Sequence, residues 1–309
     1  MITIVIVLFV AGAIWQSVMV SYEAQTYKAV GDYLSVDTYI AHYYSKGDGD
    51  ITFVFIAGSG TPCAYTDFYN LQDYLAVYGL TVTFDHAGLG WSSETDSPRD
   101  IESLVRELSI IIDAAGKPDV VLVCHSLGSL EAIGYAQANP GKVKGIIFLD
   151  GGSPEYYRSQ HELLLKAMNR AMAVARFFGI NRLLGECGLK LPLYGENTRY
   201  KSLPAELQKI DKAMYYKYCG SNSTYKNIDI INENAESILS GNRLGDIPIL
   251  VLSSDSGNEW AEVQTQLSEW SENCQLFTIK NAAHFLHWTN YDETVNYVDA
   301  FIQSYKLCE

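Results

Sequence analysis

Residues 120–129, VVLVCHSLGS, lead from an unbroken apolar run into a serine flanked by small residues. The apolar run, residues 120–124, does not alternate polar and apolar positions, which is typical of a strand buried on both faces of a sheet. A helical pattern follows over residues 127–138 and ends before Pro140. Ser126 is therefore predicted to lie in a tight turn between a buried strand and a helix. This placement fits an ordinary helix N-cap, and it also fits a side chain presented above a sheet.

Apolar runs and helical patterns alternate on both sides of this stretch. Apolar runs predict buried strands at residues 51–56 and 80–84 and further strands at residues 143–149, 247–252 and 275–279, and aromatic and β-branched residues predict two shorter strands within 33–44. Helical spacing of apolar positions predicts helices near residues 67–78, 101–115, 127–138 and 292–305. This alternation indicates an α/β fold with a mostly parallel sheet flanked by helices.

The alternation is interrupted once. From residue 154 to about residue 244 the pattern is helical and rich in Tyr and Leu, without a strong strand. The strand signal then returns, so an insertion explains the pattern more simply than a separate domain. We expect a core formed by residues 30–153 and 245–309, with a helical cap at residues 154–244.

The first segment, residues 2–20, is almost wholly apolar, and its length is close to the roughly 20 residues that a helix needs to cross a bilayer. It has no polar face and precedes the whole predicted fold, which disfavours a buried strand or core helix. No Lys or Arg precedes it and no clear small-residue cleavage site follows, which disfavours a signal peptide. We expect an N-terminal membrane anchor within residues 1–21, with the remaining chain outside the cytoplasm.

The composition indicates a large buried core. Of 309 residues, 48% are hydrophobic and 19% are charged, and the formal net charge is −14. Nucleic-acid backbones bind basic surfaces, so this charge argues against a nucleic-acid partner.

The six cysteines form no C-x-x-C pair and no metal-ligand spacing with a histidine, so we predict no metal site. In an exported domain an even number of cysteines is compatible with disulfides, and Cys187 with Cys219 is the favoured pair. Buried free thiols are at least as good an explanation.

The segment from Cys124 to Gly128 resembles the nucleophile-elbow pattern G-x-S-x-G, with Cys124 in place of the first glycine. In such an elbow a strained turn exposes the serine Oγ, and small neighbours allow the turn to close. The following helix presents backbone N–H groups, and the N–H of Leu127 would stabilise a developing oxyanion. Ser126 is therefore the candidate nucleophile.

A glycine-rich turn, Gly58-Ser59-Gly60, follows the predicted strand at residues 51–56. At this place in the chain the turn would face the elbow, and the N–H of Ser59 would be the second oxyanion donor. An ordinary glycine turn without a function would have the same residues. The functional interpretation therefore depends on the position of this turn in the chain, directly after a predicted strand.

A serine hydroxyl needs a base within hydrogen-bond reach to act as a nucleophile at neutral pH. His284 follows the last predicted strand and lies in a turn of small residues. We prefer it to His287, which we expect to pack on the following helix.

The base in turn needs a carboxylate that orients it. Asp255 follows the predicted strand at residues 247–252 and is the candidate acid. Two rivals stay open, Glu259 on the same loop and Asp150 one strand earlier. Asp85 also follows a strand, but it precedes the nucleophile and is expected to fix a turn.

In this order, the motifs resemble the α/β-hydrolase fold superfamily of serine esterases, lipases and aminopeptidases, and its bacterial membrane-anchored members in particular. Residues 85–92, DHAGLGWS, are similar to the family turn D-R-x-G-x-G-x-S with His86 in place of Arg, and the likeness continues over residues 106–150. The resemblance implies an eight-stranded sheet, a cap over the active site and hydrolysis without a cofactor. Cys124 and Ser129 depart from the family pattern, since glycine is usual at both positions.

The favoured function is that of a serine hydrolase that cleaves a carboxylic ester of a small or medium, apolar molecule. An aminopeptidase or amidase of the same fold is the alternative, with cap carboxylates that would bind a substrate ammonium group. The available carboxylates are Glu155, Glu162, Glu186 and Glu196. A non-catalytic ligand-binding protein is a third interpretation. Dehalogenases and epoxide hydrolases of the family are disfavoured, because they carry Asp at the position of Ser126.

Overall fold

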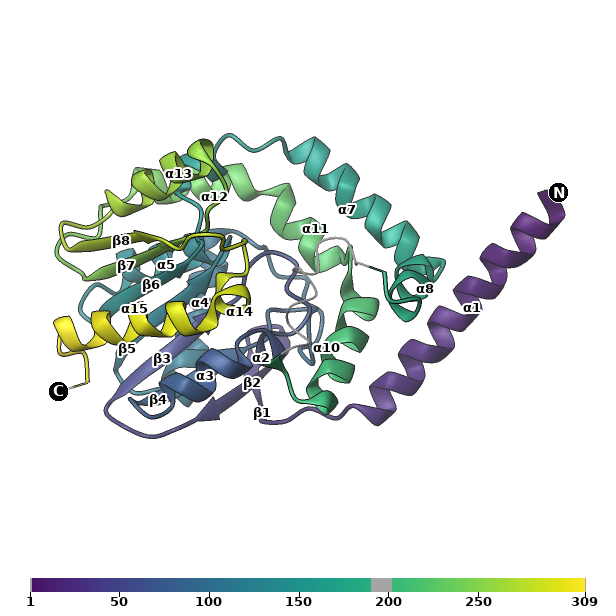
Figure 1. Ribbon diagram of the computed structural model, residues 1–309, viewed down its shortest axis with the longest axis horizontal. Helices are drawn as coiled ribbons and strands as arrows, with labels where there is room; N and C mark the ends of the chain where they lie inside the picture. The colour runs from purple at the N-terminus through teal and green to yellow at the C-terminus, as the bar shows by residue number, and fades with distance from the viewer. Residues whose placement is uncertain (1, 190–201, 309) are drawn as a thin grey trace.

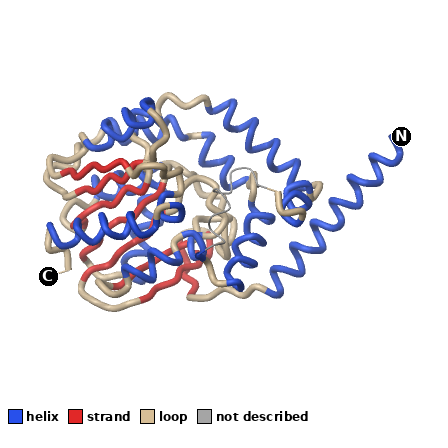
Figure 2. The backbone as a smooth tube through the Cα atoms, in the orientation of Figure 1, coloured by secondary structure: helices blue, strands red, loops and turns tan. Residues whose placement is uncertain are grey.

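The predicted strands lie side by side in one sheet with helices on both faces (Figure 1, Figure 2). The computed structural model describes residues 2–189 and 202–308 of the chain. The eight strands follow the order β1-β2-β4-β3-β5-β6-β7-β8, and every pair from β4 to β8 is parallel. The strands are β1 (Asp32–Val36), β2 (Tyr39–Lys46), β3 (Ile51–Ile56), β4 (Leu80–Phe84), β5 (Asp119–His125), β6 (Val143–Leu149), β7 (Ile249–Ser253) and β8 (Cys274–Thr278). The predicted eight-stranded, mostly parallel sheet is confirmed.

Two apolar layers hold the helices against the sheet. One layer joins the sheet to α4 (Ile101–Ala115), α5 (Gly128–Ala138) and α13 (Asn258–Ser268). The other layer joins the opposite face to α2 (Ala64–Asp67), α3 (Tyr69–Leu75), α14 (Leu286–Thr289) and α15 (Tyr291–Ser304). The central strand β3 is buried at every position, as its unbroken apolar run predicts.

Between β6 and β7 the chain forms a series of helices. They are α6 (Pro154–Tyr157), α7 (Glu162–Phe177), α8 (Ile180–Glu186), α10 (Ala205–Tyr218), α11 (Asn222–Asp229) and α12 (Ile231–Ser240). In Figure 1, α7, α8, α10 and α11 lie beyond one edge of the sheet, on the side from which the N-terminal helix projects.

The N-terminal segment forms α1 (Ile2–Thr26), which contacts α7 and α10. Among the described helices it is the one that is long and apolar enough to cross a membrane, a property that a signal sequence near an N-terminus shares. The predicted apolar helix is therefore present.

The favoured disulfide between Cys187 and Cys219 is absent, and both are free thiols. Cys187 is exposed at the end of α8, whereas Cys219 is buried against Tyr215 and Tyr216 at the end of α10. Packing separates the two thiols although both follow helices.

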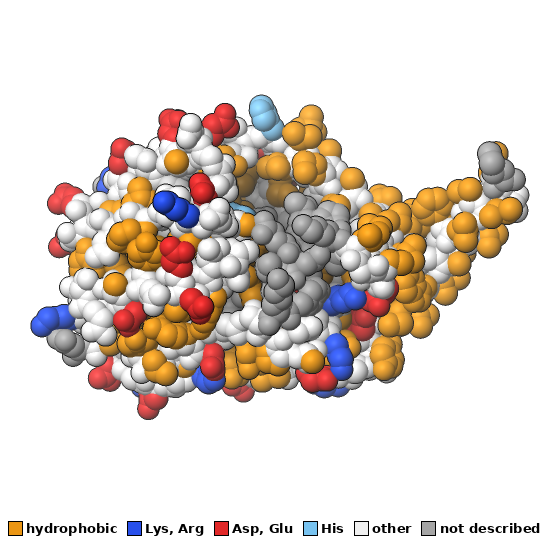
Figure 3. Space-filling model, in the orientation of Figure 1, with side chains coloured by type: hydrophobic (Ala, Val, Ile, Leu, Met, Phe, Trp, Pro, Cys, Tyr) orange, Lys and Arg blue, Asp and Glu red, His pale blue; other side chains and the backbone are white. Residues whose placement is uncertain are grey.

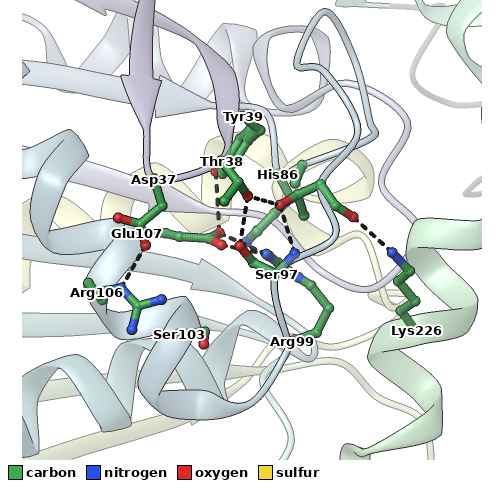
Figure 4. A network of polar contacts seen from close by, with 12 residues as sticks. Asp37, Thr38, Tyr39, His86, Ser97, Arg99, Ser103, Arg106, Glu107 and Lys226 are labelled. Carbon is green, nitrogen blue, oxygen red and sulfur yellow. Dashed lines mark hydrogen bonds and ion pairs between the residues drawn. The ribbon is translucent and has the colours of Figure 1, made fainter.

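A buried ion pair joins α4 to the loop that precedes it (Figure 4). Arg99 Nη1 donates to both carboxylate oxygens of Glu107, at 2.7 and 2.9 Å, and the two side chains are almost fully buried. The hydroxyl of Tyr39 on β2 donates to the same carboxylate at 3.3 Å. Lys226 of α11 donates to the carbonyl oxygen of Thr95 on the loop at 2.8 Å. The network therefore connects β2, α4, the loop before α4 and α11.

We expect Glu107→Ala to destabilise the protein by about 3–5 kcal/mol, because it leaves the Arg99 guanidinium buried and unpaired. The measurement is urea unfolding followed by circular dichroism. Arg106→Ala is the matched control, since Arg106 pairs with Asp37 at the surface and should change the free energy of unfolding little. Equal losses in the two variants would contradict the prediction.

Candidate active site

Ser126 occupies the turn between β5 and α5 and has a left-handed backbone, with φ of 51°. Such a conformation costs a residue other than glycine about 1–3 kcal/mol and persists only where the surrounding structure holds it. Gly128 allows the turn to pack closely against the end of β3, because a Cβ at this position would lie only 2.7 Å from the carbonyl oxygen of Ile56. The turn thus has the strained geometry expected of an elbow.

Packing accommodates the two departures from the elbow pattern. Cys124 is fully buried, its Sγ lies 3.6 Å from the carbonyl oxygen of Ile147, and burial raises the pKa of its thiol well above the usual value. The hydroxyl of Ser129 donates to the carbonyl oxygen of Gly152 at 2.6 Å. Cys124 is therefore a core thiol, and Ser129 ties the first turn of α5 to the loop after β6.

The glycine-rich loop after β3 lies directly against the elbow. A Cβ at Gly58 would be 2.9 Å from the Cβ of Ser126 and 3.1 Å from the carbonyl oxygen of His125. Ser59 and Leu127 line the same pocket as Ser126. The two residues selected as oxyanion donors are thus brought together at the serine.

His284 forms its carboxylate hydrogen bond with Asp150. The Nδ1 atom of His284 donates to Asp150 Oδ2 at 2.7 Å. Asp150 is buried, and its Oδ1 accepts from the backbone N–H of Ser254 at 2.6 Å and from Trp260 Nε1 at 2.7 Å. Three donors therefore fix the carboxylate that orients the histidine.

The carboxylate chosen from the sequence, Asp255, lies elsewhere. It is exposed, and its Oδ2 accepts from the backbone N–H of Asn281 at 3.3 Å. Glu259 is also exposed, in the first turn of α13. The structure thus gives His284 the rival partner, Asp150. Parallel strands β6 and β7 end side by side, with Leu149 opposite Leu252, so chain order alone does not separate their loops.

Asp85 and His287, which were set aside as acid and base on sequence grounds, both make structural contacts. Asp85 accepts hydrogen bonds from the backbone N–H groups of Ala64 and Trp91, at 2.7 and 3.1 Å, and from His42 Nδ1 at 2.8 Å. The expectation that Asp85 fixes a turn agrees with these contacts. His287 is buried in α14, with its Nε2 3.6 Å from a carboxylate oxygen of Asp67.

Two residues beside the site were not selected from the sequence. Tyr157 of α6 lines the larger pocket together with Ser126, and burial raises the pKa of its hydroxyl, which is therefore neutral. His125 Nε2 donates to the carbonyl oxygen of His284 at 3.0 Å, and burial holds the pKa of this imidazole well below its usual value. No motif marks Tyr157, which is one of many tyrosines in its segment, whereas His125 is adjacent to the serine.

Two pockets meet at Ser126 and His284. The larger has a volume of about 790 Å³, and Glu155, Glu259 and Glu262 contribute carboxylates to its lining. The smaller has a volume of about 280 Å³ and an apolar lining from Leu165, Met168, Met172, Ile228 and Phe285.

The carboxylates considered for ammonium binding differ in position. Glu155 lines the larger pocket and pairs with Arg243 at 3.1 Å. Glu186 pairs with Lys212 at 3.1 Å, and Glu162 accepts from the backbone of Asn232. Glu196 lies outside the described residues. Within residues 2–189 and 202–308, no group of three or more His, Cys, Asp or Glu side chains is placed to hold a metal ion.

Comparison with known proteins gives the same fold. An uncharacterized protein of Bacillus subtilis, YbdG, is 25% identical over 248 residues, which cover 79% of this chain and 73% of that protein. The solved structure of the epoxide hydrolase CorEH aligns with a TM-score of 0.67 at 18% identity, over 89% of this chain and 99% of that one. A thermophilic esterase from Thermogutta terrifontis aligns with a TM-score of 0.67 at 15% identity, over 89% and 99%. The family profile described as alpha/beta hydrolase fold matches residues 51–291, and the chain therefore belongs to the alpha/beta hydrolase fold family.

Proposed function

We propose that this protein is a serine hydrolase that cleaves a carboxylic ester through an acyl-enzyme. One observation carries the proposal. The 2.7 Å hydrogen bond between Asp150 and His284 orients the imidazole at a pocket that Ser126 also lines. A serine, a histidine and a buried carboxylate in this chain order are the set that acyl transfer requires.

In the proposed reaction, His284 Nε2 takes the proton of Ser126 as Oγ attacks the ester carbonyl carbon. The N–H groups of Ser59 and Leu127 hold the oxyanion of the tetrahedral intermediate. Protonated His284 gives its proton to the leaving alcohol, and an acyl-enzyme remains on Ser126. His284 then removes a proton from water, which attacks the acyl group and releases the acid.

We assign the role of the acid to Asp150. Its hydrogen bond to Nδ1 leaves Nε2 free to act as the base, and it stabilises the imidazolium that forms. The side chain of Asp255 accepts a hydrogen bond from the backbone N–H of Asn281, a contact that supports no comparable role.

We further propose that residues 154–244 act as the cap of this site. Tyr157 from α6 lines the larger pocket beside Ser126, and Leu165 and Met168 from α7 line the smaller pocket. The apolar lining supports an acyl or alkyl group as the part of the substrate that this pocket holds.

An amidase or aminopeptidase activity is the second candidate. Glu155, Glu259 and Glu262 all line the larger pocket beside Ser126, and such carboxylates would attract a substrate ammonium group. An epoxide hydrolase activity has less support despite the similar fold of CorEH, because Ser126 stands where a carboxylate nucleophile would be required.

A fluorophosphonate probe should label the protein, because the probe reacts with an activated serine. Labelling should disappear in Ser126→Ala and remain in Ser129→Ala, the matched control on the same turn. The measurement is in-gel fluorescence of folded protein. No labelling of the natural sequence would refute the hydrolase and favour a non-catalytic binder.

Asp150→Asn should lower kcat for an ester about 10⁴-fold, because the wrong histidine tautomer is then favoured. Asp255→Asn should change kcat little, which makes it the matched control. Steady-state kinetics on a p-nitrophenyl ester measure both. The reverse ranking would return the acid role to Asp255.

Substrate preference separates the two candidate reactions. We expect p-nitrophenyl esters of medium acyl chains to be cleaved with a higher kcat/KM than aminoacyl anilides, because the smaller pocket is apolar. A preference for the anilides that falls in Glu259→Gln would support the aminopeptidase instead.

A further inference from the structure

Several polar side chains of helix α7 contact the neighbouring part of the protein. Lys166 Nζ donates to Asp229 at 2.6 Å, and Asn169 Nδ2 donates to the carbonyl oxygen of Ser221 at 3.1 Å. Arg176 Nη1 donates to the carbonyl oxygen of Lys217 at 2.5 Å, and the guanidinium of Arg170 lies 3.8 Å from the ring centroid of Tyr225. These polar residues recur at helical spacing, so one stripe of α7 contacts α10, α11 and the segment between them.

The opposite side of α7 is apolar and faces outward. Leu163 is 81% exposed, Leu164 58% and Phe177 64%. The exposed apolar residues of α7 and α8 are Leu163, Leu164, Met168, Val174, Phe177, Ile180 and Leu183. A surface helix in water normally has the reverse arrangement, with its apolar stripe toward the core. A large contiguous apolar surface of this kind marks contact with a membrane or a partner.

Helix α1 continues this apolar surface. In Figure 3 hydrophobic side chains cover α1 and the neighbouring helices at the same end of the molecule. The backbones of the two elements touch, because a Cβ at Gly12 would lie 2.3 Å from the carbonyl oxygen of Phe178. The rings of Phe9 and Phe178 pack edge to face, with centroids 4.8 Å apart.

Two polar side chains of α1, Gln16 and Glu23, bind the rest of the protein. Gln16 Nε2 donates to the carbonyl oxygen of Tyr216 at 2.6 Å, and Gln16 Oε1 accepts from Arg182 Nε at 2.8 Å. Arg182 Nη2 donates to Glu23 at 2.8 Å. The side that α1 turns to the protein therefore combines these polar contacts with the apolar contact of Phe9, and its exposed residues in the N-terminal half include Ile4, Ile6 and Leu8.

The contacts between α1 and the end of α7 fix how deeply the two helices can enter a bilayer relative to each other. Phe9 and Gly12 lie in the middle of the apolar run at residues 2–20, and both contact Phe178 at the end of α7. If this part of α1 enters the hydrocarbon of a bilayer, Phe178 and its neighbours must lie at a similar depth.

We propose that α1, α7 and α8 form one membrane-binding surface, composed of the apolar run of α1 and the exposed apolar residues of α7 and α8. The occupant is a lipid bilayer. Continuity with a helix long and apolar enough for a membrane favours lipid over a protein partner. The protein then binds the bilayer through the apolar residues of all three helices, and not through α1 alone.

Fluorescence quenching by lipid tests this surface. The full chain, with Cys187, Cys274 and Cys308 replaced by Ser, receives one new cysteine at a time, which is labelled with an environment-sensitive fluorophore. The two test sites are Leu8→Cys on α1 and Phe177→Cys on α7. The control is Val77→Cys, because Val77 follows α3, away from α1 and α7, and its side chain is 78% exposed to solvent. The protein is reconstituted in phosphatidylcholine vesicles that contain doxyl-labelled phosphatidylcholine.

We expect strong quenching at residues 8 and 177 and none at residue 77. Quenching at residue 8 without quenching at residue 177 would overturn the proposal, because α1 would then enter the bilayer alone. Equal signals at residues 177 and 77 would overturn it as well.

Labelling native cysteines avoids any change in the apolar surface. Cys187 is exposed at the end of α8 and Cys308 is exposed near the C-terminus. In Cys308→Ser the label at Cys187 should be quenched, and in Cys187→Ser the label at Cys308 should not. The opposite pattern would refute the proposal. No readout depends on activity, so the result is independent of the proposed hydrolase function.

Discussion

The close approach of the turn after β5 to the end of β3 is the constraint on which the site depends. The carbonyl oxygen of Ile56 leaves no room for a Cβ at residue 128, and the elbow backbone leaves little room for one at residue 58. These two glycines let the loop after β3, the serine and the first turn of α5 meet. Ser126 then has a left-handed backbone that the buried strands on either side hold in place.

The same edge of the sheet positions the acid. Asp150 follows β6, the neighbour of β5, and it too has a positive φ, 49°. Its carboxylate is buried, but it is fully hydrogen-bonded by Ser254, Trp260 and His284. A buried carboxylate with three donors keeps its orientation, which is what a base at His284 needs. Donors from the loop after β7 thus fix a residue at the end of β6.

The helices between β6 and β7 have contacts on two sides. On the inner side, Tyr157 and residues of α7 line the two pockets that meet at Ser126. On the outer side, α7 exposes apolar residues beside α1. Met168 belongs to both sides, since it lines the smaller pocket and is 46% exposed. A bilayer on the outer side would therefore lie close to the site.

Local patterns determined much of this protein in advance. Apolar runs predicted six strands, β3 to β8, and aromatic and β-branched residues predicted β1 and β2, all to within about two residues. Burial on both faces explains the apolar runs of central strands such as β3 and β5, whereas β8 at the edge of the sheet is largely exposed. The small residues around Ser126 and in the turn before His284 indicated that both side chains follow the ends of strands, where they come together in one site. Only the tertiary structure decided between Asp150 and Asp255, since adjacent parallel strands end at one edge and a hydrogen bond depends on the distance across it. It also decided that Cys187 and Cys219 remain apart and that α7 turns its apolar side outward. An amphipathic sequence specifies two faces of a helix, and the contacts of the whole chain determine which face is buried.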